Sequence, residues 1–130
     1  PLSKQVRGYL TDLAEMLGRE GYVFPSARSS KRPMSENTLN AAFRRMGYSK
    51  EEVTAHGLRA TASTFLNESG LWNPDAIERA LAHGDSNVVR GIYHRGKHWD
   101  ERVRMAQWWS DYLDELRTGG KVIMGKFAKG

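Results

Sequence analysis

Residues 54–84 of the 130-residue chain have the sequence TAHGLRATASTFLNESGLWNPDAIERALAHG, which holds two helical patterns separated by helix-ending residues. Apolar residues of the first pattern recur at the three-to-four-residue spacing of a helix face: Leu58, Ala62, Phe65 and Leu66. Gly70 then follows as a helix end. These features predict a helix from about His56 to Ser69 that buries this face.

A second helix is predicted to begin at Asn73-Pro74-Asp75. Asn suits the N-cap, Pro suits the first helical position, and an acid suits the positive end of the helix dipole. Ile77 and Leu81 are its expected buried residues, and Gly84 is its expected end. Two consecutive helices in so short a stretch favour a helical fold.

Upstream of this pair, the pattern predicts two more helices and a short strand. An amphipathic helix is expected over residues 4–17, and a strand end over residues 22–24 leads into a basic loop over residues 26–33. Capping residues mark the helix that follows: Ser35 and Glu36 at its start and Gly47 beyond its last turn.

Downstream, residues 85–87 (DSN) are expected to cap a short helix that runs to Tyr93. A long helix is then expected from about Asp100 to Leu116. The apolar face of the long helix is unusually wide: Val103, Ala106, Trp109, Leu113 and Leu116, with Met105, Trp108 and Tyr112 beside them. Such width predicts that the helix is covered on more than one side. Trp99 and the two tryptophans of this face are expected in the core, and the fold class is mainly α with a small β element.

The composition fits one soluble, cytoplasmic domain. The chain has 20 Lys and Arg against 15 Asp and Glu, and its pI of about 9.7 modestly favours a polyanionic partner. The lack of cysteine excludes disulfide scaffolds, iron–sulfur clusters and thiolate zinc sites. No apolar run is long enough to span a membrane, and the N-terminus lacks the order of a signal peptide.

Three polar elements carry the chemical signal: residues 56–59 (HGLR), residues 81–84 (LAHG) and Tyr93. His56 and Arg59 share a helix face near the positive end of the dipole, so both can address one anion. Taken alone, each element has an ordinary structural explanation. These are an ion-pairing surface, a histidine at a helix C-terminus, and a half-buried tyrosine with a bonded hydroxyl.

The order and spacing of the three elements resemble the tyrosine recombinase (phage integrase) family. Residues 34–66 (MSENTLNAAFRRMGYSKEEVTAHGLRATASTFL), 77–93 (IERALAHGDSNVVRGIY) and 101–116 are similar to consecutive stretches of its prophage-type integrases. The resemblance covers nearly the whole chain apart from its tail. It implies a helical catalytic domain of the DNA breaking-rejoining type, in a site-specific recombinase that integrates or excises a prophage, a genomic island or another mobile element.

The resemblance also implies a role for each polar residue. Tyr93 would attack a DNA phosphodiester and form a 3′-phosphotyrosyl link, and a 5′ hydroxyl would leave. Arg59 would grip two nonbridging oxygens with its planar fork. His56 would assist proton transfer, and His83 would donate a hydrogen bond to a nonbridging oxygen. The phosphotyrosyl link keeps the bond energy, so neither ATP nor a metal nor any other cofactor is expected.

Two residues of the family have no match in this sequence, namely a second clamping Arg and a general-acid Lys on a β-hairpin. Because residues 1–5 resemble the stretch just after that hairpin, we expect residues 1–117 to be the C-terminal part of the catalytic domain, truncated at its N-terminal side. Residues 118–130 are expected to be a flexible or exchangeable tail. Such a piece should cleave DNA poorly alone, although the full-length enzyme would be active.

Double-stranded attachment-site DNA is the expected partner. Candidate contacts to its phosphates lie in the basic loop, on the following helix and near Tyr93: Arg28, Lys31, Arg32, Arg44, Arg45, Arg90 and Arg95. A solvated charged face is the alternative explanation for these residues. The resemblance further implies a homotetramer in the DNA synapse, a monomer or weak oligomer without DNA, accessory DNA-bending proteins, and a bacterial cytoplasm.

Three other functions stay open from the sequence. A type IB topoisomerase uses similar groups to relax DNA, although the short spacing from His83 to Tyr93 favours a recombinase. A non-catalytic helical DNA-binding module would use the basic loop and leave Tyr93 packed. A metal cluster of His83, His94 and His98 is disfavoured, because no Cys or acidic residue is placed to complete it.

Overall fold

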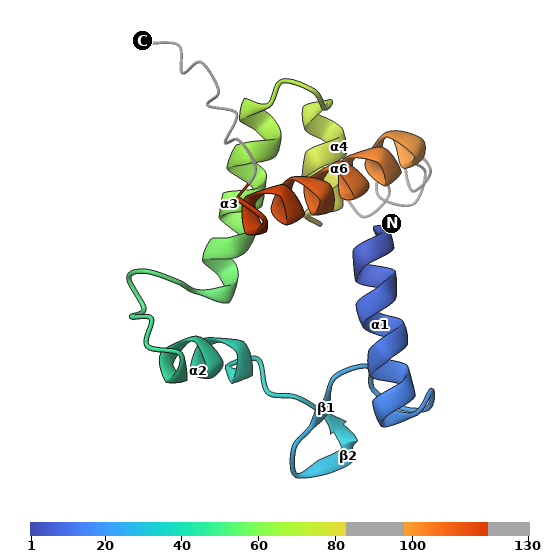
Figure 1. Cartoon of the computed structure of the whole chain (residues 1–130), viewed down its shortest axis with the longest axis vertical. Helices are drawn as coiled ribbons and strands as arrows, with labels where there is room; N and C mark the ends of the chain where they lie inside the picture. The colour runs from blue at the N-terminus through green and yellow to red at the C-terminus, as the bar shows by residue number, and fades with distance from the viewer. Residues whose placement is uncertain (83–97, 120–130) are drawn as a thin grey trace, which may run out of the picture. The chain divides into compact units, whose positions relative to one another are not determined.

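The computed structural model describes residues 1–82 and 98–119, and within these ranges the chain is mainly helical (Figure 1). The described elements follow one another as α1 (Lys4–Leu17), β1 (Pro25–Ser26), β2 (Ser29–Pro33), α2 (Thr38–Arg45), α3 (Ala55–Glu68), α4 (Pro74–Ala80) and α6 (Trp99–Arg117). This confirms the predicted class of a helical domain with a small β element.

The chain divides into two compact units. The N-terminal unit is Gln5–Ala60 and contains α1, the two strands and α2. The C-terminal unit combines Pro1–Lys4 with Thr61–Gly130 and contains α4 and α6. Helix α3 crosses the boundary, so its first residues belong to one unit and its last residues to the other.

The buried core lies in the C-terminal unit and is formed by residues of α3, α4 and α6, with Ala76 of α4 fully buried as well. Leu66 is 4% exposed, Ile77 is 0% exposed and Met105 is 2% exposed. Half-buried apolar residues pack around these three: Trp72, Leu81, Trp108 and Trp109. Burial of Leu66 and Ile77 was predicted, whereas Met105 was expected only beside the main apolar face of α6.

Aromatic rings surround this core. The Trp108 and Tyr112 rings stack with centroids 5.5 Å apart and an angle of 6° between their planes. The Phe65 ring from α3 lies 5.8 Å from Tyr112 and 6.3 Å from Trp109. The ring contacts therefore join the second half of α3 to α6 within the C-terminal unit.

Several apolar residues that were predicted to be buried are in fact exposed. On α3, Leu58 is 53% exposed and Phe65 is 41% exposed. On α6, side chains of the expected main face are also exposed: Val103, Leu113 and Leu116. Trp99 is half exposed and lies under the Arg102 guanidinium instead of in the core. Helical spacing shows that a face is apolar, but burial also needs a partner opposite each position.

The start of α4 follows the predicted capping chemistry. The Asn73 side chain accepts a hydrogen bond from the Asp75 N–H at 2.9 Å, and Pro74 is the first helical residue. Asn73 has an extended backbone conformation, as an N-cap residue should. The Asn-Pro-Asp sequence was therefore interpreted correctly.

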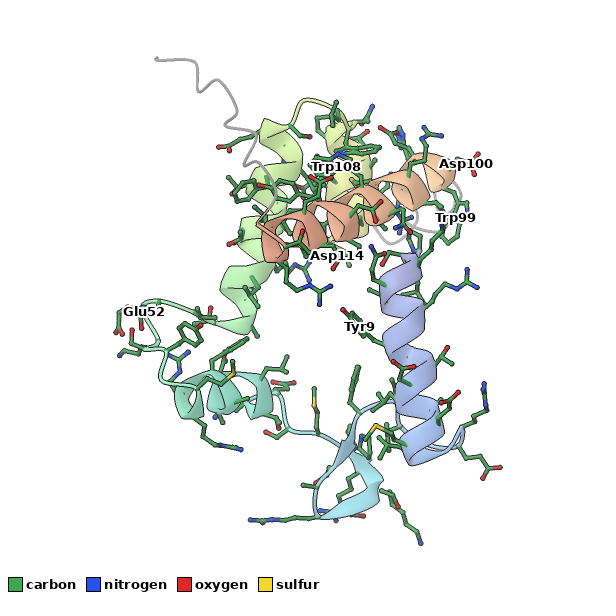
Figure 2. All side chains as sticks on the ribbon, in the orientation of Figure 1. Tyr9, Glu52, Trp99, Asp100, Trp108 and Asp114 are labelled. Carbon is green, nitrogen blue, oxygen red and sulfur yellow. The ribbon has the colours of Figure 1, made fainter. Side chains whose placement is uncertain are left out.

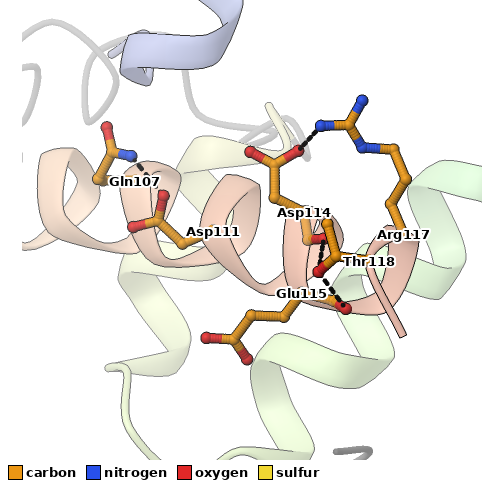
Figure 3. Close-up of polar contacts among 6 residues, drawn as sticks. All are labelled: Gln107, Asp111, Asp114, Glu115, Arg117 and Thr118. Atoms are coloured by element: carbon orange, nitrogen blue, oxygen red, sulfur yellow. Dashed lines mark hydrogen bonds and ion pairs between the residues drawn. The ribbon is translucent and has the colours of Figure 1, made fainter. Parts of the chain in front are cut away.

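Helix α6 ends within one residue of its predicted end, at Arg117. Thr118 Oγ1 donates to the carbonyl oxygens of Asp114 at 3.0 Å and Glu115 at 3.2 Å, and Arg117 pairs with the Asp114 carboxylate at 3.1 Å (Figure 3). The Thr118 hydroxyl therefore gives a side-chain partner to carbonyls of the last turn, and the Asp114 carbonyl also accepts from the Thr118 backbone N–H. A cation in the last turn also suits the negative end of the helix dipole.

The first residues of the chain are bound to α6. Ser3 is buried, and its Oγ accepts a hydrogen bond from Ser110 Oγ at 2.7 Å. The backbone N–H of Lys4 donates to the Gln107 side chain at 2.9 Å. Residues 1–4 therefore belong structurally to the C-terminal unit, although α1 starts at Lys4.

The segment predicted to be a basic loop instead forms most of a β-hairpin. β1 and β2 pair antiparallel, with Pro25 opposite Pro33 and Ser26 opposite Ser29. The strand end predicted over residues 22–24 is wrong, since these residues precede β1. Strands are recognised in sequence by apolar alternation, and β2 is a polar, largely exposed strand without this signal.

Helix α2 starts later than the sequence predicted. Its N-cap is Asn37, whose side chain makes no capping hydrogen bond, so Glu36 lies before the helix and not in its first turn. Ser35 Oγ instead accepts from the Asn37 N–H at 3.3 Å. The predicted end is confirmed, because Gly47 has φ +94° and its N–H donates to the Arg44 carbonyl.

Candidate functional site

The N-terminus of α3 carries the two described residues of the predicted catalytic set. Thr54 Oγ1 accepts a hydrogen bond from the Gly57 N–H at 2.8 Å, which places Thr54 in the capping position before Ala55. His56 and Arg59 therefore lie in the first two turns of α3. The His56 side chain is exposed, and that of Arg59 is half-buried.

His56 and Arg59 are three residues apart, so their side chains are neighbours on the helix surface. Within residues 1–82 and 98–119, neither side chain forms a hydrogen bond or an ion pair. The dipole at this helix end adds positive potential. A guanidinium and an imidazole at this position favour binding of an anion such as a phosphate.

The segment before α3 is held by α2. Asn40 Oδ1 accepts a hydrogen bond from the Ala55 N–H at 2.9 Å. Arg44 Nη2 donates to the Val53 carbonyl, and Arg44 Nε donates to the Asn40 carbonyl at 3.4 Å. Arg44 is half-buried, so this candidate DNA-contacting residue has an internal role in the structure. Asn40 could not be identified from sequence, because its partner is 15 residues away.

An acidic residue also takes part in this segment. Glu52 lies between α2 and α3 (Figure 2), and its carboxylate accepts a hydrogen bond from the Ser49 N–H at 2.7 Å. Hydrogen bonds from the Ser49 backbone and side chain lower the pKa of Glu52, and the Arg44 charge lowers it further. Glu52 is therefore ionised at neutral pH and places a negative charge in the segment between α2 and α3.

The cations of the hairpin are exposed. Arg28 lies in the turn between the strands, and Lys31 and Arg32 lie on β2. Arg45, in the last turn of α2, is exposed as well. None of the four forms an ion pair with a residue in the described ranges. Each cation is therefore available to a polyanion, which is what the predicted phosphate contacts require.

The other predicted site residues lie outside the described residues: His83, Arg90, Tyr93 and Arg95. His94 of the considered metal cluster lies there too, and His98 has its Nδ1 atom 2.9 Å from a Glu101 carboxylate oxygen. Among the described residues, no three candidate ligands are grouped to hold a metal ion. No helix in the described ranges is long and apolar enough to cross a membrane.

Sequence comparisons relate the chain to known integrases. It is 49% identical to the integrase of Enterobacteria phage P4 over 91% of this chain and 27% of that protein. It is 41% identical to the prophage integrase IntA of Escherichia coli K12 over 95% of this chain and 29% of that protein. It is also 40% identical to the integrase of Shigella phage Sf6 over 88% of this chain and 30% of that protein.

The chain spans less than a third of the length of these curated relatives. No solved structure gives a significant match. The family model described as "Phage integrase family" matches residues 1–98, a range that includes α1 to α4 and all four residues of the predicted catalytic set. The chain therefore belongs to the phage integrase family.

Proposed function

We propose that the chain is part of a site-specific DNA recombinase that integrates or excises a mobile element such as a prophage. The observation that supports this proposal most is the pair of an exposed His56 and a half-buried Arg59 at the capped N-terminus of α3, in a chain of the phage integrase family. Neither side chain has a partner among residues 1–82 and 98–119. A cationic fork at the positive end of a helix is suited to a phosphodiester. Similarity to proteins named integrase supports the same function.

In the proposed reaction the Tyr93 oxygen attacks a DNA phosphorus in line. A bond forms between that oxygen and phosphorus, the bond from phosphorus to the 5′ oxygen breaks, and the 5′ oxygen leaves as a hydroxyl after taking up a proton. A second 5′ hydroxyl later attacks the 3′-phosphotyrosyl link and releases Tyr93. The number of phosphoester bonds is unchanged at each step, so the reaction needs no external energy source.

The other proposed catalytic residues act on the charge of the transition state. Arg59 would donate two hydrogen bonds to nonbridging oxygens, and His83 would donate one. His56 would contact the phosphate and assist proton transfer, a role suited to an imidazole that titrates near neutrality. The exposed cations of the hairpin and Arg45 of α2 would hold the flanking DNA by its phosphates.

We propose in addition that residues 1–117 are the C-terminal part of the catalytic domain and that residues 118–130 are a separate tail. The resemblance supports this division, because no residue here matches the family's second clamping Arg or its hairpin Lys. The 130-residue chain alone should then form little covalent complex with attachment-site DNA. Efficient complex formation by this chain alone would contradict the proposed division of the active site.

The proposed partners are double-stranded attachment sites and further copies of the full-length protein, assembled as a tetramer on DNA. The apolar patch of Val122, Ile123 and Met124 in an otherwise glycine- and lysine-rich tail supports a tail that packs on a neighbouring copy. Deletion of residues 118–130 from the full-length protein should then reduce DNA-dependent assembly. Unchanged assembly after the deletion would rule out exchange of the tail.

The full-length protein on a suicide substrate tests the proposed function. This DNA is nicked so that the cleaved end diffuses away and the covalent protein–DNA adduct accumulates. We expect an adduct for the wild type, none for Tyr93→Phe, and a normal adduct for the control Tyr48→Phe, whose side chain is exposed in the N-terminal unit. Specific DNA binding without any adduct would instead identify a non-catalytic binding module. Relaxation of supercoiled DNA without exchange of partners would identify a topoisomerase.

A further inference from the structure

We propose that Asn40 and Arg44 are positioning residues that fix the start of α3 and thereby the placement of His56 and Arg59 against the scissile phosphate. The inference rests on the proposed recombinase function. Neither residue is assigned a contact with DNA in this role. Both act through the backbone of residues 53–55, immediately before His56.

Asn40 and Arg44 reach this backbone from the same face of α2. They are four residues apart in one helix, so their side chains point in the same direction. Asn40 accepts from the Ala55 N–H at 2.9 Å, and Arg44 donates to the Val53 carbonyl. A donor and an acceptor thus hold two backbone groups that are two residues apart, which constrains both the position and the direction of the segment.

The Ala55 N–H needs such a partner. The first N–H groups of a helix have no carbonyl partner within the helix. Thr54 satisfies the N–H of Gly57, but the N–H of Ala55 is satisfied from α2, 15 residues upstream. The N-terminus of α3 is therefore capped partly by its own segment and partly by another helix. Loss of the Asn40 acceptor would leave this N–H free and allow the first turn to shift or fray.

Arg44 is a half-buried cation whose guanidinium binds backbone groups of its own unit. Its Nη1 atom is buried and has no hydrogen-bond partner in the described residues, while Nη2 and Nε bind the carbonyls of Val53 and Asn40. A lysine at this position keeps the charge but offers a single ammonium group in place of the planar fork. The two carbonyls are 13 residues apart in the chain, so a point charge is poorly shaped to hold both.

Small displacements at this helix start are costly for catalysis. A reacting group displaced by about 1 Å can lose about 100-fold in rate even when the mutation is remote from the chemistry. His56 directly follows Ala55, and Arg59 is one turn further along the same helix. A disturbed start of α3 should therefore slow cleavage while the DNA-binding cations of the hairpin remain in place.

The test uses the full-length protein on the suicide substrate described above, with single-turnover adduct formation at saturating DNA. We expect Asn40→Ala and Arg44→Lys to slow adduct formation by about 10- to 100-fold. Asn40→Asp keeps a side-chain acceptor for the Ala55 N–H and should restore a rate close to that of the wild type. Matched controls are Asn37→Ala, whose side chain makes no capping bond, and Arg7→Lys, at an exposed cation of α1.

DNA affinity over a salt series separates positioning from direct contact. Arg44→Gln removes the charge, so a phosphate contact by Arg44 would lower the salt slope by about 0.9, whereas a positioning role leaves the slope unchanged.

Rates are measured at a temperature at which circular dichroism shows each variant folded. Wild-type rates for folded Asn40→Ala and Arg44→Lys, equal losses in Asn40→Asp and Asn40→Ala, or a reduced slope for Arg44→Gln would overturn the inference. An adduct that persists in Tyr93→Phe would instead overturn the proposed function.

Discussion

The Glu101 carboxylate in α6 accepts a hydrogen bond from the backbone N–H of Asn73 at 2.7 Å and so binds the residue that caps α4. A second oxygen of the same carboxylate lies 2.9 Å from His98 Nδ1. One side chain therefore joins the starts of two helices that pack against each other in the C-terminal unit. The hydrogen bond from Asn73 lowers the pKa of Glu101, and the contacts with His98 and the charge of Arg104 lower it further, against an opposing effect of burial.

The lowered pKa of Glu101 predicts a loss of stability in acid. Its folded-state pKa lies below the unfolded value of about 4.3, so the stabilising contribution is complete above that value and is lost as the pH falls through the folded pKa. Glu101→Gln should lower the melting temperature at neutral pH but have a smaller effect in acid, once the pH has fallen through the folded-state pKa and the wild-type carboxylate is protonated. Melting followed by circular dichroism measures both differences. Glu115→Gln, at an exposed acid of the same helix, is the control, and equal effects of Glu101→Gln at both pH values would contradict the prediction.

Truncation of the core should be far more damaging than truncation of the exposed face of α6. Ile77 is fully buried between Leu66 and Met105, and Ile77→Ala should reduce the free energy of unfolding by about 2–5 kcal/mol. Leu113 is 44% exposed, and Leu113→Ala should cost less than about 1.5 kcal/mol. Urea denaturation followed by circular dichroism gives both values. Similar losses for the two variants would mean that a further segment covers Leu113.

The hairpin cations should contribute to DNA affinity in a salt-dependent way. If Arg28, Lys31 and Arg32 each contact one phosphate, replacing any one of them with Gln should lower the slope of log affinity against log salt by about 0.9. Fluorescence anisotropy with labelled attachment-site DNA and the full-length protein measures the slope. Lys50→Gln is a suitable control, since Lys50 is exposed but lies 3.7 Å from the Glu51 carboxylate. An unchanged slope in all three hairpin variants would indicate a solvated face.

The Arg59 fork should matter for rate more than for binding. Arg59→Lys keeps the positive charge but loses the two-point grip on a phosphate, so the single-turnover rate of adduct formation should fall about 100- to 1,000-fold. DNA affinity of the full-length protein should change only a few-fold. Arg7→Lys, at an exposed position of α1, should leave both quantities unchanged. A loss of affinity as large as the loss of rate would assign Arg59 to DNA binding alone.

Local chemistry made the helices predictable from sequence, whereas long-range contacts were not. The residues that begin α4 and the glycine that ends α2 act on their immediate neighbours, so their effect was visible in the sequence. The hairpin was missed because its strands are short and polar. The exposure of Val103 and the burial of Met105 depend on where α3 and α4 lie, which helical periodicity alone does not contain.

In the candidate site too, local features were predictable from sequence and long-range contacts were not. The position of His56 and Arg59 at a helix start followed from spacing alone, and the structure confirms it. The contacts of Asn40 and Arg44 with residues 53–55 had no signal, because a side chain that binds a distant backbone group leaves no periodic pattern. The assignments of His83 and Tyr93 stay predictions, since both lie outside the described residues.

The distribution of indole rings gives the chain a built-in optical probe. All four tryptophans belong to the C-terminal unit: Trp72, Trp99, Trp108 and Trp109. The N-terminal unit contains tyrosines instead, namely Tyr9, Tyr22 and Tyr48. Emission excited selectively from tryptophan therefore reports the state of the C-terminal unit, and a loosening confined to residues 5–60 would leave that emission largely unaltered.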